Sequence, residues 1–184
     1  MTYFQVATDA RFSPPDLCDR RADSFARRVR LRNLFEYAAG AALLIGFPAV
    51  GWVFARLGEW EMVGAIGLCV AGVIVVIALL YRRAGNLERR PEQPCRAYLM
   101  AQYRHQRDAL ASVPKWYLGP LLPGLFAVYG VVAVKVAAKA GIAAALAGIA
   151  VPAIATLTFF GFVWWVNAWA ARRLDREIAA LARE

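Results

Sequence analysis

Only a few side chains in this sequence could carry chemistry. The single histidine, His105, has no second histidine and no nearby cysteine with which to share a metal ion. The three cysteines, Cys18, Cys69 and Cys95, lie too far apart for a zinc or redox motif. Cys69 stands inside an apolar run, where a thiol behaves as a small hydrophobic side chain. We therefore expect no metal centre, no cofactor and three free thiols.

Catalytic groups are equally scarce. The sequence offers no Ser/His/Asp set around its one histidine, no glycine-rich phosphate loop and no paired carboxylates within its apolar segments. We therefore expect no catalytic residues and a protein that is not an enzyme.

Two polar residues stand at the edges of long apolar segments. Glu36 could couple protons to transport, because a carboxylate inside the membrane is energetically costly and is usually found there only at functional sites. The plainer alternative is an ion pair with Arg32, one helical turn earlier. Asn167 is expected to hydrogen-bond to another helix, with contact to a ligand as the alternative.

Arginine supplies most of the net charge of +9. Residues 16–32 and 95–113 both show helical periodicity, and the first of these segments is a basic amphipathic helix of the kind that lies on a membrane surface. We predict that the two helices form a basic platform for a partner. Its candidate residues are Arg20, Arg27, Arg28, Arg30, Arg32, Arg104 and Arg107.

The apolar content of 60% and the mean hydropathy of +0.45 are too high for an ordinary soluble domain of this length. Four apolar segments of about 20 residues each match a hydrocarbon core of about 30 Å. We predict an all-α polytopic membrane protein, with four transmembrane helices in two antiparallel hairpins plus amphipathic cytoplasmic helices. The predicted order is a flexible tail, the basic helix, hairpin 1, a cytoplasmic loop with an amphipathic helix, hairpin 2 and a cytoplasmic tail (residues 1–15, 16–32, 33–81, 82–115, 116–171 and 172–184).

Charge also predicts the orientation. Of the 22 lysines and arginines, only Arg56, Lys135 and Lys139 lie in the short connections, which leaves 22 − 3 = 19 on the other side. Basic residues stay on the cytoplasmic side during insertion, so we expect both termini in the cytoplasm of a bacterium and the spans in its inner membrane. The first apolar segment starts too late for a signal peptide and is expected to be an uncleaved anchor. The arginines flank the spans, so they favour anionic lipid headgroups over nucleic acid.

Small residues recur at four-residue spacing in the last span, as at Ala144 and Gly148. This spacing lets helix backbones approach closely, either inside the bundle or in contact with a second copy or another membrane protein. The motif Gly119–Gly124, with two prolines, is expected to shape packing at the start of the third span.

Several stretches resemble small proteobacterial inner-membrane proteins, whose genes often stand beside those of extracytoplasmic-function sigma factors. Residues 28–40 (RVRLRNLFEYAAG) resemble the start of their first span, and residues 106–110 (QRDAL) with 116–124 (WYLGPLLPG) resemble the start of their third. Pro114 departs from the pattern, where an aromatic residue is expected. The resemblance implies no catalytic residue, and it makes a regulatory role toward a cytoplasmic factor conceivable.

Three functional hypotheses follow. The first is a non-enzymatic inner-membrane interaction or regulatory protein that presents its basic platform to a partner. The second is an accessory subunit of a larger membrane complex, joined through the face that carries Ala144 and Gly148. The third is a small oligomeric transporter with Glu36 as the proton-coupling group.

Overall fold

The computed structural model describes residues 15–90 and 92–183, and every regular element in them is helical. The elements are α1 (Pro15–Arg56), α2 (Trp60–Arg83), α3 (Cys95–Ala111), the π-helix η1 (Pro114–Leu118), the 3-10 helix η2 (Gly119–Leu121), α4 (Leu122–Ala140) and α5 (Ile142–Arg183). The all-α prediction is confirmed for these residues. Of the predicted tail, only Pro15 lies within the described residues, and it begins α1.

Four helical segments are long and apolar enough to cross a membrane, namely Leu17–Arg56, Trp60–Arg83, Pro114–Ala140 and Ile142–Arg183. The prediction of four apolar helices of spanning length is confirmed, which is compatible with a multi-pass membrane protein. α1 and α5 each contain 42 residues, which corresponds to about 63 Å and twice the hydrocarbon thickness. The predicted basic helix and first span are therefore one continuous helix, and the predicted C-terminal tail continues α5.

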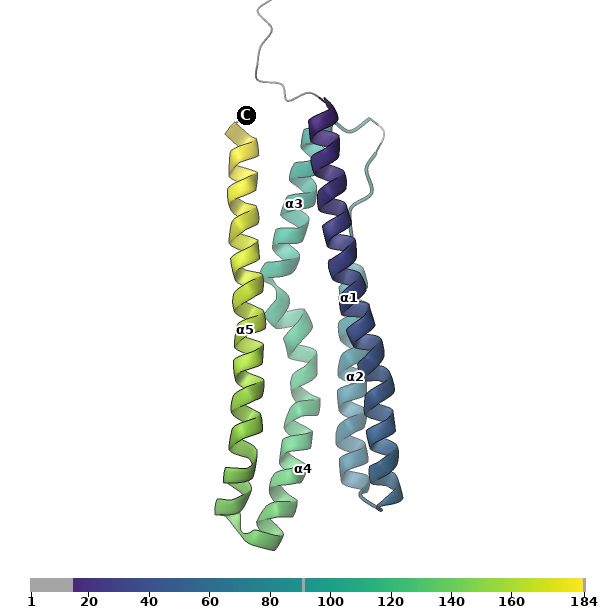
Figure 1. Cartoon of the computed structure of the whole chain (residues 1–184), viewed down its shortest axis with the longest axis vertical. Coiled ribbons are helices and arrows are strands. Elements are labelled where there is room, and N and C mark those ends of the chain that lie inside the picture. Colours follow the sequence, from purple (N-terminus) through teal and green to yellow (C-terminus); the bar gives the residue numbers. More distant parts are fainter. Residues whose placement is uncertain (1–14, 91, 184) are drawn as a thin grey trace, which may run out of the picture.

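The chain runs down α1, returns along α2, descends again through α3, η1, η2 and α4, and returns along α5 (Figure 1). In the lower part of this view α1 packs on α2, α2 on α4 and α4 on α5, while in the upper part α3 packs chiefly on α5 and less on α1. α1 and α5 form the two flanks and are not packed along each other. We call α3 with residues 15–32 and 167–183 the three-helix unit, and the remainder the spanning half.

In the spanning half, glycine lets helix backbones touch. A Cβ added at Gly72 of α2 would lie 2.5 Å from the carbonyl oxygen of Pro120 in η2. A Cβ at Gly124 of α4 would lie 2.7 Å from the backbone of Cys69. Both distances are too short for a side chain, so only glycine fits here without movement. This is the packing role that the sequence motif Gly119–Gly124 predicts.

Buried amides hold the connection between α2 and α3. Asn33 of α1 donates to the carbonyl of Ala84 (2.7 Å), and Gln106 of α3 donates to the same oxygen (3.2 Å) and to that of Gly85 (2.9 Å). Gln102 is 1% exposed and accepts from the backbone N–H of Leu87 (2.8 Å). Buried polar groups need such partners, so these bonds position α3 against the end of α2.

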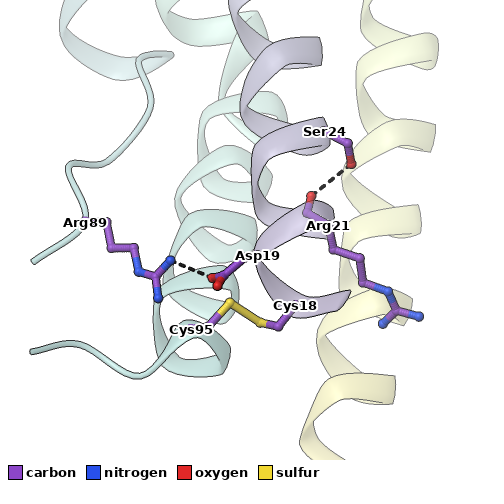
Figure 2. The surroundings of a disulfide bond; sticks show 6 residues. All are labelled: Cys18, Asp19, Arg21, Ser24, Arg89 and Cys95. Atoms are coloured by element: carbon purple, nitrogen blue, oxygen red, sulfur yellow. Dashed lines mark hydrogen bonds and ion pairs between the residues drawn. A yellow bond between two sulfur atoms is a disulfide. The ribbon is translucent and has the colours of Figure 1, made fainter. Parts of the chain in front are cut away.

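A disulfide closes the far end of the three-helix unit. Cys18 in the first turn of α1 is bonded to Cys95 at the start of α3, with their Cα atoms 6.2 Å apart. Beside it, Arg89 pairs with Asp19 at 2.7 Å, as Figure 2 shows. The prediction of three free thiols is therefore wrong for two of them, and it holds for Cys69, which is free and buried. The error arose because α1 and α3 begin at the same end of the molecule, which residue spacing along the chain does not reveal.

A small apolar core lies next to the disulfide. Ala22, Tyr98, Leu99 and Leu181 are buried together, so the start of α1, the start of α3 and the end of α5 meet there. Arg96 also donates to the carbonyl of Leu181. The C-terminal part of α5 is thus an integral part of the three-helix unit.

Candidate functional site

A cleft of about 450 Å³ lies in the three-helix unit between the flanking helices α1 and α5. α3 contributes Tyr103, Gln106 and Leu110 to it. The size is that of a pocket for a small or medium-sized ligand. The cleft is closed by α3 on one side and open on the other, because α1 and α5 do not pack on each other.

Four arginines line this cleft. Arg21, Arg28 and Arg32 follow one face of α1 at spacings of seven and four residues, and Arg173 comes from α5. One carboxylate, Glu177, lines it as well. None of the four arginines joins an ion pair among the described residues. The cleft therefore carries a strongly positive charge, which favours binding of an anion.

The other walls are apolar. Phe25 and Val29 of α1 face Trp169 and Leu174 of α5. Tyr103 packs edge to face on Phe25, with ring centroids 4.7 Å apart. Burial raises the pKa of Tyr103, with Glu177 adding to the shift, so this phenol stays neutral at physiological pH. The cleft thus suits a ligand with one charged end and one apolar end.

Arg32 lies at the base of the cleft and is half-buried. Its guanidinium donates to Asn33 Oδ1 (3.1 Å) and to Gln106 Oε1 (3.2 Å), both neutral acceptors. The expected ion pair with Glu36 is not found among the described residues. Because two amides are already within reach, the arginine bonds to them, and its charge lacks a carboxylate at contact distance.

The remaining platform candidates do not share this cleft. Arg20, Arg27 and Arg30 are exposed on other faces of α1, and Arg104 is exposed on α3. Arg107 pairs with Asp175 of α5 at 3.1 Å and with Asp108 at 2.8 Å, so it joins helices. Of the seven arginines predicted to form one platform, the structure therefore brings only Arg28 and Arg32 together in the cleft.

Glu36 and Asn167 line one small cavity of about 40 Å³ just below the cleft, together with Arg32. Glu36 accepts a hydrogen bond from the hydroxyl of Tyr117 at 2.5 Å. Asn167 donates to the carbonyl of Val163 in its own helix at 2.7 Å, so the predicted bond to another helix is wrong. Its side chain points along α5, where that carbonyl, one turn earlier, is the nearer partner.

A third cavity, of about 400 Å³, lies in the spanning half between the same two flanks. Leu43 and Phe47 of α1 form one wall, and Phe159 and Phe160 of α5 form the other. α2, η2 and α4 provide the floor. Apart from Thr156, whose hydroxyl is hydrogen-bonded to Tyr129 at 2.6 Å, the lining is apolar or thiol. We call this cavity the apolar slot.

The small-residue face of α5 is only partly used for packing. Ala144 is half-buried, whereas Gly148 is exposed and a Cβ there would meet nothing within 4 Å. The bundle interior therefore does not require the glycine at 148.

Several cleft residues were not among the sequence candidates. These are Arg21, Tyr103, Trp169 and Arg173. The signal that could have found Arg21 is its spacing to Arg28 and Arg32 on one helix face. No such signal links Arg173 to them, because it lies at the other end of the chain.

The comparisons with known proteins give no family. No family model matches the chain, and no curated protein or solved structure matches it. In the described residues no group of three metal-ligating side chains comes together. The resemblance to small proteobacterial inner-membrane proteins thus stays a prediction, and function has to be argued from the cleft.

Proposed function

We propose that this chain is a non-enzymatic membrane interaction protein whose three-helix unit binds an anionic partner. One observation carries the proposal: four arginines and one carboxylate share a cleft of about 450 Å³ with apolar walls. A positive cleft with so little internal compensation favours a negatively charged ligand. The binding surface is narrower than the seven-arginine platform inferred from sequence.

We further infer that α1 with α2, and α4 with α5, cross the membrane as two antiparallel hairpins. The lengths of α1 and α5 support this, because about 30 Å of each remains after one crossing. The three-helix unit then stands outside the hydrocarbon as the basic amphipathic element of the chain. The excess of lysine and arginine on that side favours the cytoplasmic face of a bacterial inner membrane.

The test compares two pairs of arginines in the full-length protein. It is extracted gently from its own membranes, and the bound species are identified by native mass spectrometry. R28Q/R173Q should lose the bound anionic species by about tenfold or more, because each arginine near such a site contributes about 1 kcal/mol. The control R20Q/R27Q removes the same charge from exposed positions outside the cleft.

The outcomes separate the hypotheses. Loss in R28Q/R173Q alone supports the cleft. Loss in R20Q/R27Q alone returns the binding surface to the outer face of α1, and no bound anion in any variant refutes the proposal.

The accessory-subunit hypothesis keeps one supporting observation, the exposed Gly148 on α5. If this face meets another membrane protein, G148L should release the chain from the complex without unfolding it. The transporter hypothesis has less support, because Glu36 is engaged with Tyr117 beside a cavity of only about 40 Å³. E36Q that leaves proton-coupled uptake unchanged would remove it.

A further inference from the structure

Three cavities in the described part of the chain lie one after another between α1 and α5. The arginine cleft takes Arg28 and Arg32 from α1 and Trp169 from α5. The small cavity below it takes Arg32 and Glu36 from α1 and Val163 and Asn167 from α5. The apolar slot lies further along the same two helices. The cavities therefore follow one another along the same two helices: first the basic cleft, then the small cavity that Glu36 and Asn167 line, then the apolar slot. We call this line between α1 and α5 the groove.

The depth of the slot can be measured along both flanks. From Arg32 to Leu43 is about 16 Å at 1.5 Å per residue, and from Trp169 to Phe160 is about 14 Å. Half of a hydrocarbon core is about 15 Å. Tryptophan favours the headgroup level, so Trp169 sets the base of the cleft at the membrane surface. The slot then lies near the centre of the bilayer, where the lower part of an acyl chain lies.

We propose, resting on the proposed function, that the anionic partner is a phospholipid of the surrounding bilayer. Its phosphate lies among Arg28, Arg32 and Arg173, and one of its acyl chains follows the groove down to the apolar slot. The open side between α1 and α5 lets the lipid enter laterally from the membrane. The basic cleft supplies charge complementarity, and the slot supplies the preference for a chain over a free anion.

The size of the slot argues against a partner helix. A transmembrane helix about 10 Å wide and 30 Å long occupies on the order of 2,000 Å³. The slot offers about 400 Å³, a fraction of that volume. An acidic protein segment could fill the cleft but would leave the slot empty.

The experiment measures lipid binding to the delipidated full-length protein in detergent by native mass spectrometry. The probes are a phosphatidylglycerol and a phosphatidylcholine with identical chains. We expect one phosphatidylglycerol to bind about tenfold or more tightly than phosphatidylcholine, and we expect R28Q/R173Q to abolish this preference. R20Q/R27Q should retain it.

A second pair of variants tests the slot. Ala155 lines the slot and is exposed, so A155F narrows the slot without placing the ring in the buried core. The control A150F puts the same ring on an exposed position of α5 that does not line the slot. We expect A155F to weaken phosphatidylglycerol about tenfold and A150F to leave it unchanged.

The outcomes distinguish this inference from the proposed function. If inorganic phosphate displaces phosphatidylglycerol, or if A155F has no effect, the site takes a free anion or a headgroup alone and the inference is overturned. If R28Q/R173Q loses an acidic protein while phosphatidylglycerol binding is unchanged, the proposed function stands and the lipid assignment fails. If phosphatidylglycerol binding is the same in all variants, the bound lipid belongs to the nonspecific lipid around the spans, and the inference fails.

Discussion

In the three-helix unit, helices are joined by a disulfide, by ion pairs such as Arg107–Asp175 and by a small apolar core. In the spanning half, α2 meets η2 and α4 by close backbone contact at glycine, and a hydrogen bond between Tyr129 and Thr156 joins α4 to α5. The difference follows from the surroundings. In hydrocarbon, apolar side chains gain little by leaving lipid for a neighbouring helix, so shape has to hold the helices together. In water or among headgroups, apolar burial and specific polar bonds both contribute.

The largest expected effect is on the three-helix unit alone. The disulfide joins residues 77 positions apart, for which the chain-entropy model gives about 4.5 kcal/mol. The spans already restrict the unfolded chain, so we expect C18S to cost somewhat less, about 2–4 kcal/mol. Limited proteolysis should then cut within residues 15–32, while the spanning half stays protected.

Reduction of the disulfide in the wild-type protein is the control for C18S. Dithiothreitol should make the wild-type protein as sensitive as C18S and should not change C18S further. If C18S resists protease as the oxidised wild type does, the amides and ion pairs hold α1 without the disulfide, and the contrast between the two regions weakens.

The disulfide also bears on orientation. Disulfides persist in oxidising compartments, yet the arginines near this one favour the cytoplasmic side. With a cytoplasmic three-helix unit, we expect Cys18 and Cys95 to be reduced in growing cells and to react with a maleimide only after it enters the cell. Labelling of both by an impermeant maleimide in reduced whole cells would reverse the predicted orientation.

A smaller effect is expected from the spanning half. G72A places a methyl group 2.5 Å from the Pro120 carbonyl oxygen, so α2 and η2 have to separate. Overpacking of this kind costs about 1–3 kcal/mol. Unfolding by a denaturing detergent should detect the loss. G67A in the same helix is the control, because its Cβ meets nothing within 4 Å. Helix propensity favours alanine over glycine at both positions. A G72A variant as stable as G67A would therefore show that close approach at Gly72 does not contribute to stability.

The spans and their four-segment count could be predicted because long apolar runs depend only on local composition. A packing role for Gly119–Gly124 could also be predicted, because glycine allows close approach of a neighbouring helix, but its partners Gly72 and Cys69 could not. The disulfide and the cleft were not, because Cys18 with Cys95, and Arg21 with Arg173, meet only after distant helices pack. The same holds for Arg32. Its spacing to Glu36, one turn away, predicts an ion pair, whereas in the structure it donates to Gln106 of another helix.

The smallest expected effect lies at the opposite end of the spanning half from the three-helix unit. There Lys135 of α4 pairs with Glu59 in the turn between α1 and α2, and with Glu61 at 2.9 Å. In the described residues these ion pairs join α4 to the turn between α1 and α2 and to the first turn of α2. The hydrogen bond from Lys135 lowers the pKa of Glu59 below its usual range. A lowered pKa means that the folded state prefers the ionised carboxylate.

The sign of the pH dependence follows. The contribution of Glu59 to the free energy of unfolding is fully present above the ordinary carboxyl pKa. It is lost as the pH falls through the lower folded-state pKa. Thermal unfolding in detergent should therefore show wild type slightly above E59Q at pH 7, with the difference vanishing in acid. Because both side chains are more than a third exposed, the difference should also shrink in high salt. A difference that persists in acid and in salt would mean that Glu59 acts through the geometry of the turn, and that charge does not join α4 to this turn.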